Sequence, residues 1–157
     1  MAWGTDARAF SEIALEYFKD SAAGGSIVDK DSECQLNYVI VIGDGAMNNV
    51  DDAEERMAAL RELGVKSLYV AYGGGITGVP LQKFHDMARI GSSTATTTAE
   101  CDADPECEKA IIADTPTDLK TALTSKIRQI IADKLAFTAP SITCLLYTSD
   151  AADEYSG

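Results

Sequence analysis

The sequence has little of several residue types that catalysis and nucleic-acid binding depend on. It contains one histidine and one tryptophan, and its 13 lysines and arginines are outnumbered by 25 aspartates and glutamates. Binding to a phosphate backbone relies on lysine and arginine, so we expect no nucleic-acid partner. The single histidine, His85, lies beside Phe84, and the sequence offers no arrangement of cysteine, serine or carboxylate with which it can be paired. We therefore predict a half-buried structural histidine and not the base of a hydrolase.

Long apolar runs are also lacking. No stretch approaches the roughly 20 apolar residues that a membrane-spanning helix needs. The first residues, 1–6, have neither the basic start nor the apolar run of a signal peptide. We expect no membrane span in this chain, and we expect any export signal to lie outside it. Its 157 residues suffice for one α/β domain and are too few for two.

The last residues differ from the rest of the chain. Residues 144–154 resemble a translation of the transposon-end adapter that is used to prepare sequencing libraries. We therefore divide the chain into a domain at 1–143 and an artefactual tail at 144–157 that carries no function. The alternative is a genuine acidic tail. If the tail is an artefact, the reading frame is a fragment of a longer protein.

Hydrophobic patterns predict an α/β domain with a mainly parallel sheet. An uninterrupted apolar run at 38–42 and a largely apolar run at 67–72 are typical of strands buried on both faces. A helical pattern at 51–63 lies between them and completes a βαβ unit. Further patterns predict helices at 6–19, 80–90 and 115–135, a loop at 91–108 and a short strand at 109–113.

Two of these helices have extended apolar faces, which we expect to be buried. In the first helix the predicted inner residues are Phe10, Ile13, Ala14, Tyr17 and Phe18. In the last helix they are Leu119, Ala122, Leu123, Ile127, Ile130, Ile131 and Leu135.

Asp44 directly follows the first predicted strand and is the leading candidate for a functional residue. Ligands of open α/β sheets bind at the carboxyl ends of the strands. Gly43 and Gly45 flank Asp44, so the chain can turn there and a ligand can approach the backbone. A carboxylate at this position can hold Mg²⁺ or Ca²⁺, which prefer oxygen ligands. The alternative is that Asp44 caps the following segment or forms an Asx turn.

The run Asn-Tyr-Val-Ile-Val-Ile-Gly-Asp-Gly at 37–45 resembles the fourth-strand motif of von Willebrand factor A (vWA) domains. The resemblance implies an N-terminally truncated, Rossmann-like, three-layer α/β/α fold in which Asp44 is the third element of a metal-ion-dependent adhesion site. Thr5, after Gly4, resembles the threonine loop that supplies the second element.

The first element, Asp-x-Ser-x-Ser, is absent from this sequence, and the family places it on an earlier strand. We therefore expect this chain to bind a divalent cation weakly or not at all. Gly43 also stands where many relatives have threonine.

The end of the predicted domain is similar to PilY-type proteins of the bacterial type IV pilus tip. The likeness covers 115–119, the long helix and 136–142, and Cys34-Gln35 before the strand also fits it. It implies a non-catalytic adhesion or protein-binding module at the cell surface or outside the cell, and in the periplasm in transit. Its partner would be a protein ligand or a component of the host or pilus surface. In the intact domain, a bound Mg²⁺ or Ca²⁺ would leave one position open for a carboxylate of that partner.

Two enzyme motifs compete for the same strand ends. The run Gly-Asp-Gly-Ala at 43–46 resembles the opening of the thiamine diphosphate motif, whose aspartate holds Mg²⁺, but no asparagine follows Asn49 where that motif needs a pair. The loop that starts with Gly73, Gly74 and Gly75 fits the nucleotide-binding pattern G-x-G-x-x-G. However, the predicted helix begins only at Pro80, after the third glycine of that pattern, so a flexible loop beside the site is favoured. A fragment of a Mg²⁺-dependent enzyme therefore remains the alternative function, and a structural spacer with a degenerate site is a third.

Cys101 and Cys107 bracket a short polar segment, and this spacing favours a small disulfide and hence an oxidising compartment. The alternative is two free thiols. Acids at alternate positions between them could ligate Ca²⁺, but the segment lacks the glycine of an EF-hand loop, so a solvated acidic loop is favoured. Cys34 then has no partner among the cysteines of the domain.

Overall fold

The computed structural model of the protein describes residues 4–19, 27–28 and 35–135. Cys34, the segment 136–143 and the tail 144–157 lie outside the described residues. The order of the elements is β1 (Thr5–Asp6), α1 (Ala7–Lys19), β2 (Asn37–Gly43), β3 (Met47–Asn48), α2 (Val50–Glu62), β4 (Val65–Tyr72), α3 (Gly78–Ile90), α4 (Thr98–Ala103), β5 (Ile111–Ala113) and α5 (Pro116–Leu135).

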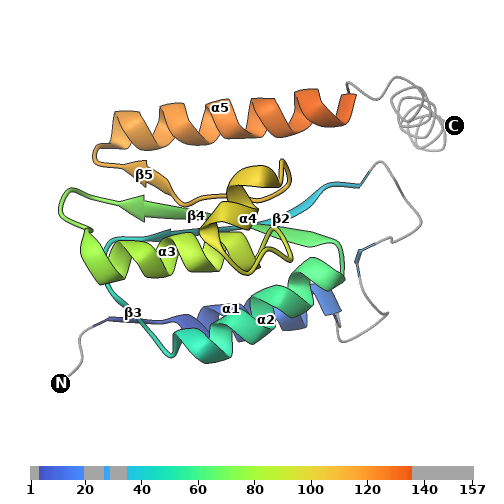
Figure 1. Cartoon of the computed structure of the whole chain (residues 1–157), viewed down its shortest axis with the longest axis horizontal. Helices are drawn as coiled ribbons and strands as arrows, with labels where there is room; N and C mark the ends of the chain where they lie inside the picture. The colour runs from blue at the N-terminus through green and yellow to red at the C-terminus, as the bar shows by residue number, and fades with distance from the viewer. Residues whose placement is uncertain (1–3, 20–26, 29–34, 136–157) are drawn as a thin grey trace, which may run out of the picture.

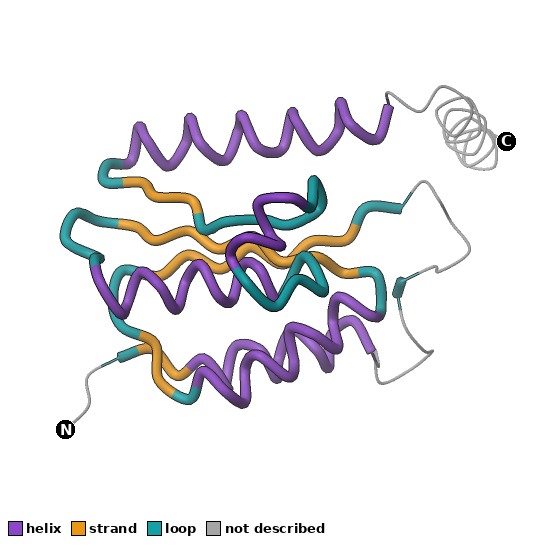
Figure 2. Tube along the Cα trace, in the orientation of Figure 1, coloured by secondary structure: helices purple, strands orange, loops and turns teal. Residues whose placement is uncertain are grey.

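Among the described residues, three parallel strands form the main sheet, in the order β2-β4-β5. β1 and β3 form a separate two-stranded parallel pair. Figure 2 shows the strands running side by side among the helices. The predicted βαβ unit is present as β2, α2 and β4. The domain is therefore a mixed α/β structure with parallel strands in open sheets, and it is compatible with a Rossmann-like fold.

The main core lies on one face of this sheet, against α2 and α3. Val39 and Val41 of β2 and Tyr69 of β4 face it, alternating along each strand with residues of the other face. The helices contribute Met57, Leu60, Phe84 and Met87, all 0% exposed. Burial of such side chains contributes roughly 1.5–3 kcal/mol each. In Figure 1, α5 lies on the opposite side of the strands from α1 and α2.

The prediction that the first strand is buried on both faces was wrong. Ile40 and Ile42 of β2 are 42% and 48% exposed, whereas their neighbours on β4, Leu68 and Val70, are buried. β2 is an edge strand of the sheet, and within the described residues no strand pairs with its other side. An apolar run predicts a strand with two apolar faces, but it does not specify the position of that strand in the sheet.

The predicted inner faces of two helices were also wrong in part. Phe18 of α1 is buried, but Ile13 and Tyr17 are 68% and 62% exposed. In α5, Ile127 and Ile131 are 42% and 46% exposed. The reason is that α1 packs mainly on α2, and α5 mainly on the short strand β5, so only part of each apolar face has a neighbour.

The predicted loop at 91–108 contains the short helix α4, which was not predicted. The Thr97 hydroxyl accepts a hydrogen bond from the N–H of Glu100, and the Glu100 carboxylate accepts one from the N–H of Thr97. This capping box satisfies two N–H groups at the start of the helix. The Thr-x-x-Glu spacing was the available signal within a segment rich in serine and threonine.

Tyr69 carries a buried hydroxyl that has no hydrogen-bond partner among the described residues. Burial also raises the pKa of Tyr69. Because an unsatisfied buried donor is destabilising, we expect Tyr69→Phe to raise the free energy of unfolding by about 1 kcal/mol. Thermal denaturation measures this, with Tyr72→Phe at the partly exposed end of the same strand as the control. A lower midpoint for Tyr69→Phe would show that the hydroxyl does have a partner.

Candidate functional site

The carboxyl ends of the parallel strands meet at one edge of the sheet. Asp44 follows β2, Gly73, Gly74 and Gly75 follow β4, and Asp114 follows β5. The strand order places the glycine loop between the other two ends. This is the edge at which open α/β sheets bind ligands, so the predicted position of Asp44 in the fold is the observed one. The prediction that the next helix begins only after Gly78 was wrong, because α3 begins at Gly78 itself.

Thr5 reaches the same region from the start of the chain. Its N–H donates a hydrogen bond to the carbonyl oxygen of Ala46 at 3.0 Å, and the two segments continue as the parallel pair β1–β3. Figure 1 shows this first segment running beside β3. Gly4 permits the close approach, because a Cβ atom there would stand 2.7 Å from the oxygen of Ala46. Since Ala46 lies two residues after Asp44, the loops of the two predicted metal ligands are neighbours.

The Thr5 hydroxyl and the Asp44 carboxylate are both exposed, and neither bonds to another described residue. A role for Asp44 in a cap or an Asx turn would need a hydrogen bond from a nearby N–H to its carboxylate, and no described residue provides one. Both side chains offer the oxygen atoms that Mg²⁺ and Ca²⁺ prefer, but such ions take about six or more ligands. Within the described ranges, no group of three histidine, cysteine, aspartate or glutamate side chains is placed to hold a metal. These two residues have suitable oxygen atoms but are too few to complete a cation site.

Asp6 and Asn49 join the two loops a second time. Nδ2 of Asn49 donates a hydrogen bond to Oδ1 of Asp6 at 2.9 Å, and the N–H of Arg8 donates to the same oxygen at 3.1 Å. The hydrogen bond from Asn49, aided by the charge of Arg8, lowers the pKa of Asp6. Nothing in the sequence indicated a contact between Asp6 and Asn49. The contact depends on the pairing of β1 with β3, which no local pattern encodes.

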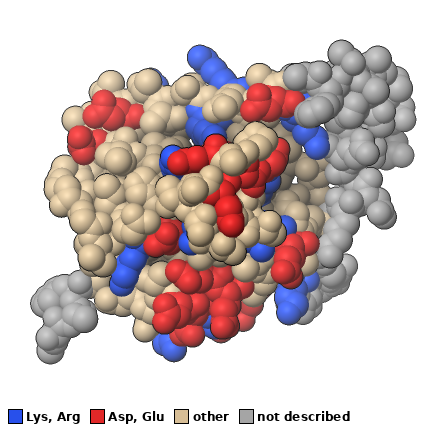
Figure 3. All heavy atoms as spheres, in the orientation of Figure 1, with Lys and Arg blue, Asp and Glu red and all other residues tan. Residues whose placement is uncertain are grey.

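An acidic hollow of about 540 Å³, which was not predicted, lies at the start of α2. Asp51, Asp52, Glu54 and Asp86 are its acids. Burial, and then the charges of Asp51 and Asp86, raise the pKa of Glu54. Figure 3 shows acidic side chains gathered on the part of the surface where α2 lies. Acids in the first turn of a helix are favoured by its dipole, which accounts for Asp51 and Asp52 without a ligand.

The two glycines beside Asp44 have different surroundings. A Cβ atom at Gly43 would stand 2.9 Å from Cζ of Phe84, whereas one at Gly45 would meet nothing within 4 Å. The Phe84 ring is 0% exposed, so its neighbours resist displacement. The structure therefore gives a reason for glycine at 43.

Substitution of these glycines tests that reason. Gly43→Ala should lower the free energy of unfolding by about 1–3 kcal/mol, because it overpacks the core. The matched change Gly45→Ala should alter the free energy of unfolding by less than about 0.5 kcal/mol. Urea denaturation followed by circular dichroism compares the two variants, and equal effects would contradict the proposed contact with Phe84.

Cys101 and Cys107 form a disulfide before β5, away from the carboxyl edge of the sheet. Asp102 and Glu106 are exposed, as expected for a solvated acidic loop, and the acids of this segment also have partners within the protein. These pairs are Asp102 with Lys109, Asp104 with Ser93 and Glu106 with Lys66.

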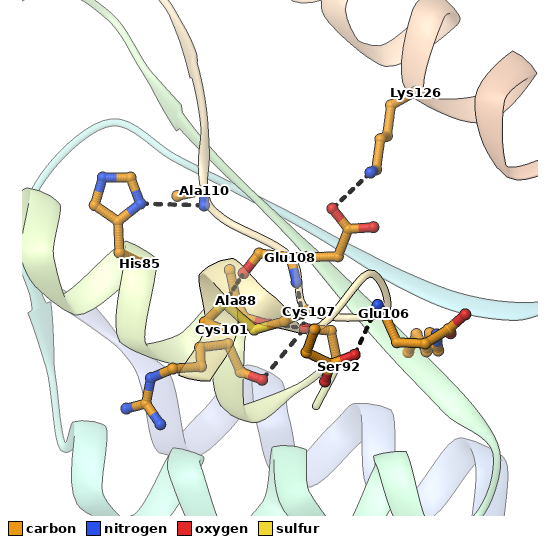
Figure 4. A network of polar contacts seen from close by, with 12 residues as sticks. His85, Ala88, Ser92, Cys101, Glu106, Cys107, Glu108, Ala110 and Lys126 are labelled. Atoms are coloured by element: carbon orange, nitrogen blue, oxygen red, sulfur yellow. Dashed lines mark hydrogen bonds and ion pairs between the residues drawn. A yellow bond between two sulfur atoms is a disulfide. The ribbon is translucent and has the colours of Figure 1, made fainter. Parts of the chain in front are cut away.

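Polar contacts beside this disulfide connect α3 and α5 to the segment that leads into β5, as Figure 4 shows. The carboxylate of Glu108 pairs with Lys126 of α5 at 2.6 Å, and the N–H of Glu108 donates to the hydroxyl of Ser92 at 2.7 Å. Nδ1 of His85 accepts a hydrogen bond from the N–H of Ala110 at 3.2 Å. His85 is half-buried and holds backbone in place, as the sequence predicted.

Comparison of the chain with models of protein families, with curated proteins and with solved structures finds no match. None of the helices in the described part of the chain is both long enough and apolar enough to span a membrane. The fold and site define the class of protein. It is an α/β domain with a parallel open sheet, and at the carboxyl edge of that sheet the loops that carry Thr5 and Asp44 lie side by side.

Proposed function

We propose that this chain is part of a non-catalytic, metal-dependent protein-binding module with a vWA-like, three-layer α/β/α fold. The observation that carries the proposal is the contact between the Thr5 loop and the Asp44 loop, made by the 3.0 Å hydrogen bond from Thr5 to Ala46. Both proposed ligands have side-chain oxygens that no described residue engages. In the intact module, Thr5 and Asp44 help to hold Mg²⁺ or Ca²⁺, and a carboxylate of the protein partner completes the coordination.

The proposal requires a third group of oxygen ligands on a further strand beside β2. The edge of β2 that has no partner within the described residues supports this requirement. So do Ile40 and Ile42, because a neighbouring strand and its covering helix would bury these half-exposed side chains. From the likeness to PilY-type proteins, we also propose that the module belongs to the type IV pilus, outside the cell. The disulfide between Cys101 and Cys107 agrees with an oxidising compartment.

Calorimetry on the parent protein tests this function. We expect a domain that includes the Asp-x-Ser-x-Ser loop to bind Mg²⁺, Mn²⁺ or Ca²⁺. Asp44→Ala should weaken binding by more than about tenfold. Mutation of a residue that only hydrogen-bonds to a metal ligand already lowers metal affinity by about 10–100-fold. Asp52→Asn, which removes an acid of the nearby hollow, is the matched control and should bind normally. Equal heats for the wild type and Asp44→Ala would remove Asp44 from the site, and a second cofactor motif in the parent sequence would favour the enzyme alternative.

A further inference from the structure

We propose that Asp6 and Asn49 form a positioning pair that holds the Thr5 loop against the Asp44 loop. The inference rests on the proposed function, because it concerns how the two proposed ligand loops are kept together. Neither residue is proposed to touch the cation.

The pairing between the two loops is short and isolated. β1 and β3 contribute two residues each, and they form a sheet separate from β2, β4 and β5. One backbone hydrogen bond, from Thr5 to Ala46, extends this pairing toward Asp44. A two-stranded pair is marginally stable by itself in water. The position of Thr5 therefore depends on additional contacts between the segments.

The hydrogen bond from Asn49 to Asp6 supplies such a contact. Oδ1 of Asp6 accepts from Nδ2 of Asn49 at 2.9 Å and from the N–H of Arg8, in the first turn of α1, at 3.1 Å. One carboxylate oxygen thus connects β1, the start of α1 and the corner that follows β3. Hydrogen bonds to an ionised acceptor are stronger than those between neutral groups.

The use of the Asn49 side chain is unusual for its position. Asn49 is the residue before α2, where an asparagine side chain commonly accepts a hydrogen bond from the first turn of the helix. It makes no such bond, and its amide donates to Asp6 instead. Its backbone is left-handed, with φ 54° and ψ 42°, a conformation that few residues other than glycine and asparagine adopt. Residue type and backbone at this corner therefore serve the contact between the loops and not the capping of α2.

Hydrogen exchange of the Thr5 amide tests the pair on this chain without any metal. Asn49→Gly removes the amide but keeps the left-handed backbone accessible, so it separates the contact from backbone strain. We expect Asn49→Gly and Asp6→Ala to speed exchange of the Thr5 N–H by up to about tenfold, the factor that corresponds to one hydrogen bond. In both variants, the amide of Val70, in the middle of β4, should exchange at the wild-type rate. In the control variant Asp52→Asn, every amide outside the corner that follows β3, including that of Thr5, should also exchange at the wild-type rate.

A rescue experiment distinguishes a direct contact from general loosening. Asn49→Asp places two carboxylates together and should speed Thr5 exchange. The double variant Asp6→Asn/Asn49→Asp restores a donor and an acceptor with their roles reversed, so exchange should return toward the wild-type rate. Unchanged Thr5 exchange in both Asn49→Gly and Asp6→Ala, or no recovery in the double variant, overturns the proposal.

Cation binding by the parent protein separates this inference from the proposed function. If both are right, Asn49→Gly weakens binding several-fold while circular dichroism is unchanged. If Asp44→Ala abolishes binding and Asn49→Gly leaves it intact, the positioning pair is refuted and the proposed function stands. If the wild-type parent protein binds no cation, the proposed function fails, and Thr5 exchange alone decides whether Asp6 and Asn49 hold the loop.

Discussion

Phe84→Ala should lower the free energy of unfolding by about 3–5 kcal/mol, the usual cost of truncating a buried aromatic ring. The ring is 0% exposed and lies in the core between α3 and the sheet. It also lies against Gly43, so it supports the strand end that presents Asp44. A loss of this size is a large part of the 5–15 kcal/mol that is typical of a folded domain. We therefore expect the variant to unfold at a clearly lower urea concentration than the wild type.

Urea denaturation measures this change, with two matched variants. Phe84→Leu keeps most of the apolar volume and should cost clearly less than Phe84→Ala. Val79→Ala lies on the same helix, but Val79 is 71% exposed, so its substitution should change the free energy of unfolding by less than about 0.5 kcal/mol. A cost below about 1 kcal/mol for Phe84→Ala would contradict the described core.

Loss of the disulfide between Cys101 and Cys107 should lower the free energy of unfolding by about 2 kcal/mol, as expected for a short closed loop. Serine at both positions should also loosen the surrounding contacts, including the pair of Glu108 with Lys126 that connects this segment to α5. Asp44 lies at the other end of the strands, so the amide signals around it should not shift.

Thermal unfolding with and without dithiothreitol checks this prediction. The reductant should lower the midpoint of the wild type and leave the double serine variant unchanged, because that variant has no bond between these positions to reduce. A wild-type midpoint that stays constant after both thiols become reactive toward a labelling reagent would show that the bond contributes nothing to stability.

Local sequence patterns predicted most helices and strands, because the spacing of apolar residues within each segment indicates its secondary structure. The strand at 38–42 and the helix at 51–63 lie within one or two residues of β2 and α2. Exposure was predicted less well. Ile40 and Tyr17 are apolar and regularly spaced, but their burial depends on which neighbouring element covers them, and their own spacing carries no information about that neighbour.

In the candidate site too, local features were predicted and contacts between distant parts of the chain were not. The position of Asp44 at a strand end followed from the strand pattern. The proximity of Thr5 rested on a resemblance, because its contact with Ala46 joins distant parts of the chain. The bond between Asp6 and Asn49 was missed for the same reason, since it forms only once β1 has paired with β3.

A titration of this chain with Mn²⁺, followed by NMR, is the most direct test of a shared cation site at Thr5 and Asp44. Paramagnetic broadening falls steeply with distance from the ion, so it locates even a weak site. The account predicts that amide signals of residues 4–6 and 43–46 broaden together and first, and that Asp44→Ala abolishes this while Asp52→Asn does not. Broadening centred on the acidic start of α2, or at residues 43–46 without residues 4–6, would contradict it.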